Sequence, residues 1–150
     1  MRVPWTLRSN VTEKQLDAIA AAVDEAESRT SGEVHVHIVR NLLPLEKPRE
    51  RAVRTFYRLR MDQTRQRNGV LVFVAMKQRC FEIVADAGIA GKVDAEIWDE
   101  IAEIMAEQID HEDFATGMAA GIQKIGEVLA KHFPRGDDDI NELPNQPSLG

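Results

Sequence analysis

Val70-Leu-Val-Phe-Val-Ala-Met76, the link Lys77-Gln-Arg79 and Cys80-Phe-Glu-Ile-Val-Ala85 together determine how this chain folds. The first segment is a continuous run of apolar, mostly β-branched and aromatic residues, which predicts a strand buried on both faces. A three-residue link is too short for a crossover connection, so the last segment must return as an antiparallel neighbour. The sequence therefore predicts a β-hairpin at the centre of the chain.

A strand and a helix are predicted before this hairpin. Residues 33–39 alternate in character, with two sets of side chains on opposite faces: Val34, Val36 and Ile38 against Glu33, His35, His37 and Val39. Residues 49–60 carry an apolar stripe that predicts a helix. A strand–helix–strand unit is parallel and right-handed. Because the hairpin adds an antiparallel strand, the predicted sheet is mixed.

Two further helices carry start signals. Thr12 and Gln15 have the spacing of a capping box and open a first helix. Residues 86–91 are predicted to form a glycine-bearing loop. Asp94, which follows this loop, is the expected N-cap of a helix over residues 95–109.

A last helix is predicted near residues 113–132, where Gly117 and Gly121 indicate close backbone packing because glycine otherwise weakens a helix. The elements together predict an α/β fold, a three-layer α/β/α sandwich with a small mixed β-sheet, within residues 1–133. Residues 134–150 are predicted to form an acidic, proline-containing tail that is extended or mobile.

Composition predicts one globular domain in the cytoplasm. The chain has 150 residues, a net charge of −6 and one cysteine, Cys80. The negative charge argues against a nonspecific nucleic-acid binder, and no apolar segment is long enough to span a membrane. A single cysteine fits a reducing compartment. Cys80 opens a strand, so it is interpreted as a core residue and not as a nucleophile.

Charge is distributed unevenly along the chain. Residues 47–67 contain eight basic and two acidic residues, whereas residues 86–113 contain ten acidic residues and one lysine. Both segments can simply be solvated surfaces; alternatively, one binds anions and the other binds cations. Arg65 and Arg67 are possible anion-binding residues because arginine forks suit phosphate and carboxylate. The alternative is that they bridge to the chain's own acids.

Four acidic side chains lie close in sequence to the end of the hairpin and the start of the next helix: Asp86, Asp94, Glu96 and Asp99. Carboxylates gathered in this way suit a hard, oxygen-seeking cation, although acids near a helix start are also favourable by themselves. His35 and His37 share one strand face and could contribute to a zinc site. No third ligand is identifiable, so two histidines partly covered by a helix are the preferred interpretation.

The chain resembles the TPM domain family over residues 11–143. The resemblance rests on four motifs in order, Thr30-Ser-Gly-Glu33, Arg67-Asn-Gly-Val-Leu71, Asp86-Ala-Gly-Ile89 and Ile97-Trp98, and on the tail segment 138–144, which is similar to that of short bacterial members. It implies an α/β/α fold and, by analogy with some relatives, a calcium or other divalent-cation site. Asp86 and Asp94 are the implied ligands, with Glu33 a weaker third. Longer members carry a carboxylate where this chain has Ala90.

Three functions follow as hypotheses. The first is a regulatory or interaction module that binds a divalent cation, possibly calcium. The second, suggested by a thylakoid-lumen relative described as an acid phosphatase, is a metal-assisted phosphomonoesterase in which Arg67 steadies the substrate. The third is a protein–protein interaction domain without metal, which pairs its basic and acidic helices with a partner or between copies. The partner and the oligomeric state are left open.

Overall fold

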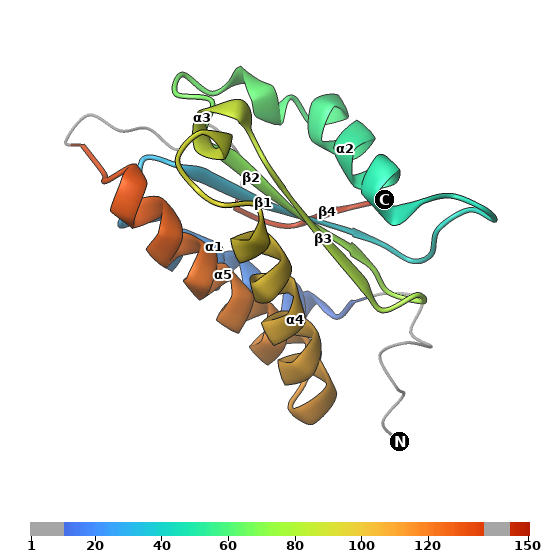
Figure 1. Cartoon of the computed structure of the whole chain (residues 1–150). Helices are drawn as coiled ribbons and strands as arrows, with labels where there is room; N and C mark the ends of the chain where they lie inside the picture. Colours follow the sequence, from blue (N-terminus) through green and yellow to red (C-terminus); the bar gives the residue numbers. More distant parts are fainter. Residues whose placement is uncertain (1–10, 137–144) are drawn as a thin grey trace.

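A computed structural model describes residues 11–136 and 145–150. The elements follow one another along the chain as α1 (Glu13–Glu27), β1 (Glu33–Val39), α2 (Pro48–Arg58), the short 3-10 turn η2 (Met61–Gln63), β2 (Gly69–Ala75), β3 (Cys80–Ala85), α3 (Ala87–Ala90), α4 (Glu96–His111), α5 (Phe114–His132) and β4 (Ser148–Leu149). Figure 1 shows the sheet between two helical layers.

The sheet is mixed, as predicted, with the strand order β3-β2-β1-β4. β1 runs parallel to β2, from the pair Glu33 and Gly69 to the pair Val39 and Ala75. β3 returns antiparallel to β2. The short link, residues 76–79, and the intervening helix α2 dictate these two directions, which confirms the predicted hairpin and crossover unit.

Helices α1, α4 and α5 cover one face of the sheet and α2 covers the other (Figure 1). The two faces of β1 and β2 explain this arrangement, because their alternate side chains enter different cores. Val36 and Val72 pack in the core with α1, α4 and α5. Leu71 and Phe73 pack in the core with α2, against Phe56. The three-layer α/β/α sandwich is therefore confirmed.

The starts of the helices match the sequence at two of four places. Thr12 and Gln15 form the predicted capping box, and Asp113 caps α5. The loop predicted for residues 86–91 instead contains the helical turn α3, which Asp86 caps. The prediction that Asp94 caps the next helix is wrong: α4 begins one residue later, after Ala95, whose backbone is already helical and whose side chain cannot cap.

The glycines of α5 allow close contact with α4, as predicted. A β-carbon built on Gly117 would lie 2.2 Å from Cγ1 of Ile109, and one on Gly121 would lie 2.1 Å from Cγ of Met105. At Gly117 a β-carbon would also lie 2.8 Å from the backbone nitrogen of Ile109, so α4 would have to move, whereas at Gly121 the side chain of Met105 would have to move. This close packing offsets the cost of glycine within a helix.

The fourth strand was not predicted. Residues Ser148–Leu149 pair in parallel with His37 and Ile38 of β1, so this part of the tail is extended and joins the sheet. Two residues are too short for a periodic pattern, which explains the omission. The tail motif at 138–144 lies outside the described residues. Within the described ranges, no helix has both the length and the apolar character needed to cross a bilayer.

Candidate functional site

Asp86, the first predicted metal ligand, is held by Arg67. The Nε and Nη2 atoms of Arg67 each donate a hydrogen bond of 2.8 Å to the Asp86 carboxylate, and the backbone N–H of Ala87 donates a third at 2.7 Å. The Asp86 side chain is only 3% exposed. These bonds also raise the pKa of Arg67. For Arg67, the alternative of bridging to one of the chain's own acids is therefore correct.

The other predicted ligands lie apart from this ion pair. Asp94 is exposed ahead of α4, and Glu33 is buried at the start of β1, beside Glu27. Residues 11–136 and 145–150 contain no group of three or more His, Cys, Asp or Glu side chains arranged to hold a metal ion. Arg65 is exposed. The proposed calcium site stays a prediction.

The direction of β3 explains why these carboxylates do not lie where ligands usually bind. In open α/β sheets, ligands gather beyond the carboxyl ends of the parallel strands. β3 is antiparallel, so its carboxyl end, with Asp86, lies beside the amino end of β2, where the Asp86 N–H donates to the Gly69 carbonyl at 3.0 Å. The carboxyl ends of β1 and β2 are at the opposite edge.

Glu27 and Glu33 form a buried carboxyl pair at this amino edge. Glu27 is 5% exposed and Glu33 is 2% exposed. One oxygen of Glu27 accepts the N–H of Val34 at 2.8 Å, whereas its Oε1 has no hydrogen-bond partner among the described residues. Burial raises the pKa of Glu27 to about 9, helped by its charge and hydrogen-bond interactions with Glu33. The pair therefore holds a proton at neutral pH.

A pocket of about 690 Å³ lies at the opposite edge, beyond the carboxyl end of β1. We call it the arginine pocket. Its walls come from the end of β1 and the following loop, from α2 and from the residue after β4: Val39, Arg40, Asn41, Leu43, Glu46, Arg51, Arg54, Thr55, Arg58 and Gly150. β1 has parallel neighbours on both sides, β2 and β4. This is the position at which the fold class places ligands.

Glu46 organises two of the arginines. Its carboxylate accepts bonds of 2.8 Å from Nη1 of Arg51 and 2.6 Å from Nη2 of Arg54, and it also accepts the N–H of Leu43 at 3.1 Å. The Leu43 N–H is the main cause of the lowered pKa of Glu46, followed by the two arginines. The lining of the pocket thus contains four arginines and one carboxylate, which gives it an excess of positive charge.

The two histidines of β1 both contact Ser148 of the neighbouring strand β4. Nε2 of His35 and Nδ1 of His37 are 2.8 and 2.6 Å from the same Ser148 hydroxyl. His37 also stacks on Phe73. Burial lowers the pKa of His37 to about 4, with further contributions from Arg58, His35 and Arg51. His37 is therefore neutral, and it shares the Ser148 hydroxyl with His35.

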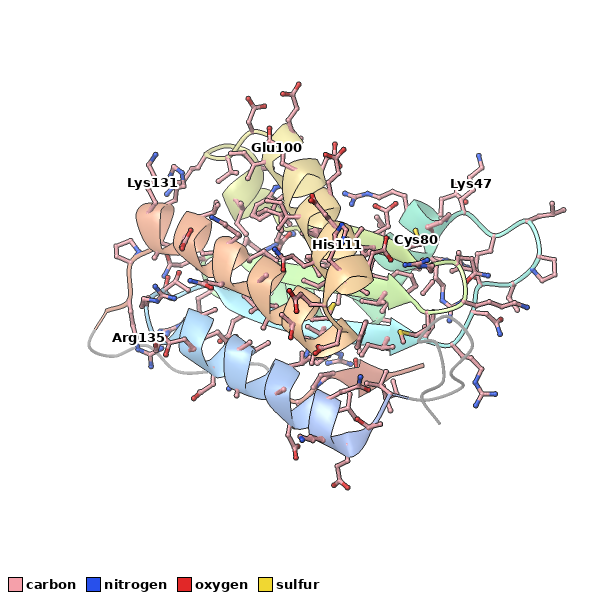
Figure 2. The ribbon with its side chains drawn as sticks, turned by 90° about the horizontal axis from the view of Figure 1, so that it is seen from below. Lys47, Cys80, Glu100, His111, Lys131 and Arg135 are labelled. Atoms are coloured by element: carbon pink, nitrogen blue, oxygen red, sulfur yellow. The ribbon has the colours of Figure 1, made fainter. Side chains whose placement is uncertain are left out.

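The acidic segment and the cysteine both have the structural roles expected of them. Glu100 lies on the outer side of α4 with other exposed acids (Figure 2), as a solvated surface requires. Burial raises the pKa of the Cys80 thiol, which supports its interpretation as a packed residue. Figure 2 shows Cys80 and Lys47 at one end of the molecule, and Lys131 and Arg135 at the other.

Sequence reasoning missed the arginine pocket and the role of Glu27. A signal for the pocket existed, since Arg51, Arg54 and Arg58 recur at the three- and four-residue spacing of one helix face. Glu27 offered no comparable signal, because it ends an otherwise ordinary amphipathic helix.

The chain is thus an α/β/α sandwich with a mixed sheet and a pocket beyond the carboxyl end of β1. The family profile of the TPM domain matches residues 9–128, and the chain belongs to this family. The BA42 protein of the psychrophilic bacterium Bizionia argentinensis, solved by NMR, is 38% identical, with a TM-score of 0.86 over 96% of this chain and 98% of that chain.

Two more distant structures share the fold alone. The N-terminal domain of the cg2496 protein from Corynebacterium glutamicum is 12% identical, with a TM-score of 0.63 over 91% of this chain and 84% of that chain. The N-terminal domain of a P. gingivalis protein is 13% identical, with a TM-score of 0.66 over 82% and 78% of the two chains. No curated protein sequence matches this chain.

Proposed function

We propose that this TPM domain is a binding module that takes an anionic group, a phosphate or a carboxylate, in the arginine pocket. The observation that carries the proposal is the lining of the pocket by Arg40, Arg51, Arg54 and Arg58 with one carboxylate, Glu46, among them. Guanidinium forks present paired N–H donors that match both kinds of oxyanion.

The contacts within the pocket favour a bound anion over a closed internal network. Glu46 engages one Nη atom of Arg51 and one of Arg54, so other N–H donors of each fork stay available. Arg58 makes no ion pair with a described residue, and its positive charge contributes to the lowered pKa of His37. An oxyanion between these side chains would offset their mutual repulsion.

A titration of inorganic phosphate, followed by NMR of backbone and arginine side-chain signals, tests this proposal. We expect shifts confined to residues of the pocket and binding that weakens as salt increases. Arg58→Gln should weaken binding by about ten- to a hundredfold, since one charge-assisted hydrogen bond contributes roughly 1.5–3 kcal/mol. Arg65→Gln is the matched control, because Arg65 is exposed outside the pocket. Equal binding by both variants would contradict the proposal.

A divalent cation at the Glu27–Glu33 pair is a second candidate. It is favoured by the buried carboxyl oxygen of Glu27 that lacks a hydrogen-bond partner among the described residues. A calcium ion could replace the shared proton, and cation binding should then strengthen with pH. Calcium should raise the melting temperature more at pH 8 than at pH 6, Glu33→Gln should abolish the rise, and Asp86→Asn should preserve it. A pH-independent or absent rise excludes this site.

The phosphomonoesterase hypothesis has less support, because Arg67, its intended substrate-binding residue, is engaged by Asp86. If the purified chain hydrolyses an aryl phosphate faster than its Arg58→Gln variant does, the phosphomonoesterase hypothesis would gain support, with the arginine pocket as the substrate site.

A further inference from the structure

The loop between β1 and α2 presents two leucines to solvent beside the arginine pocket. Leu43 is 65% exposed and Leu45 is fully exposed. Figure 1 shows this loop extending past the end of the sheet. Leu45 also has a φ of 64°, in the left-handed region that bulky residues rarely adopt. A conformation of this kind persists only where surrounding contacts enforce it.

Specific contacts hold the loop in place. The side chain of Leu42 is buried in the core beside α2, and its N–H donates to Oε1 of Gln78 at 3.2 Å. Leu43 and Glu46 close a turn around Leu45. The Glu46 N–H donates to the Leu43 carbonyl at 3.0 Å, and the Leu43 N–H donates to Oε1 of Glu46 at 3.1 Å. Leu45 is therefore displayed on a fixed turn, and its exposure is built into the loop.

The surroundings of the two leucines are strongly basic. Residues 40–60 contain seven basic and two acidic residues, in a chain whose net charge is −6. A second hollow, lined by apolar and charged residues, shares Leu43, Glu46 and Arg54 with the arginine pocket. Apolar side chains at a protruding tip and cations behind them form one continuous surface.

We propose that this surface docks on an anionic lipid bilayer, with a lipid phosphate in the arginine pocket and Leu43 and Leu45 inserted among the headgroups. The inference rests on the proposed anion-binding function and specifies its ligand. A lipid surface is favoured over an acidic protein segment because the leucines protrude from a convex tip, where a membrane can surround them. Apolar insertion and attraction of basic residues to anionic lipids then act together.

Sedimentation with vesicles tests the inference. The whole chain should bind vesicles that contain phosphatidylglycerol and not vesicles of pure phosphatidylcholine, with binding lost at high salt. The double variant Leu43→Ser, Leu45→Ser should bind about tenfold more weakly, and Lys47→Gln a few-fold more weakly. Leu149→Ser and Lys124→Gln change exposed residues outside the loop and should bind normally.

The outcomes separate this inference from the function on which it rests. If phosphate shifts the pocket signals but no anionic vesicle binds, lipid docking is wrong and anion binding stands. If neither ligand binds, both proposals fail. If the double leucine variant binds anionic vesicles as tightly as the natural chain, insertion of the leucines is wrong. Tighter binding to a polyglutamate peptide than to vesicles overturns the lipid assignment in favour of an acidic protein partner.

Discussion

The carboxyl groups of Glu27, at the end of α1, and Glu33, at the start of β1, interact with each other in the interior of the protein. Ionising both carboxyl groups would place two negative charges side by side away from water, which is energetically unfavourable, so the pair retains a proton. This arrangement links the stability of the fold to pH, and it locates that link at the amino edge of the sheet.

Stability should fall as pH rises from about 5 to 9. The pKa of Glu27 is raised from 4.5 to about 9 in the folded state, so the folded chain binds more protons than the unfolded chain across this window. The contribution is fully present below the unfolded pKa and disappears as pH rises through the folded one, with a slope of up to roughly 1.4 kcal/mol per pH unit. Urea unfolding at several pH values measures it.

Glu27→Gln should flatten this dependence, because the amide stays neutral. Glu25→Gln, an exposed position on the same helix, should leave the slope unchanged. A variant at Glu27 with the slope of the natural chain would show that another group is responsible.

Arg67→Met should lower the free energy of unfolding clearly more than Arg65→Met does, because the buried Asp86 carboxylate loses two charge-assisted hydrogen bonds. Arg67 is half-exposed, so water replaces part of the lost interaction. Arg65→Met is the control and should change stability by less than about 0.5 kcal/mol. Chemical denaturation measures the free energy of unfolding of both arginine variants. Adding Asp86→Asn to the Arg67 variant should recover part of the lost stability. Equal effects of the two arginine variants would contradict the role of the ion pair.

Gly88→Ala should destabilise the chain by about 3 kcal/mol. A β-carbon there would lie 2.2 Å from the carbonyl oxygen of Gln66 and 2.6 Å from that of Arg67, and both are backbone atoms that must move. Gly91→Ala is the matched control: its β-carbon meets nothing within 4 Å and its φ is −80°. It should be neutral or stabilising by about 0.4–1 kcal/mol. A thermal melt that ranks the two variants the other way would refute this packing.

Ser148→Ala should loosen β4. The hydroxyl is shared by His35 and His37, and its removal leaves buried ring nitrogens without that partner, at a cost of about 1–3 kcal/mol. The Gly150 N–H, which donates to Ile38 at 2.9 Å, should then exchange faster with solvent. Leu149→Ala, which changes an exposed side chain, should leave that exchange rate unchanged. Unaltered exchange in the Ser148 variant would mean that backbone pairing alone holds the strand.

The fold was predictable because its signals are local. The apolar run over residues 70–76, the short link after it and the capping box at Thr12 each specify one element, and the packing of the layers follows from alternation in β1. The fourth strand was not predictable, since Ser148–Leu149 carries no pattern and is defined by its partner on β1.

The site was harder to predict for a different reason. Residues near one another in sequence, such as Asp86 and Asp94, were expected to converge, but the side chain of Asp86 is turned to an arginine nineteen residues away. The arginine pocket combines β1, α2 and the residue after β4, and only the three-dimensional arrangement brings these segments together.

Because β3 runs antiparallel to β2, the contacts of Asp86 lie at the amino ends of β1 and β2, and the arginine pocket lies at their carboxyl ends. At the amino ends, the ion pair of Asp86 with Arg67 and the close backbone contact at Gly88 stabilise the fold, so substitutions there lower the free energy of unfolding. The other edge carries a turn anchored by Leu42 and Glu46, whose tip touches none of those contacts. Substitutions at the tip of this turn should therefore leave the melting temperature of the domain nearly unchanged, whereas substitutions at Asp86 or Gly88 should lower it.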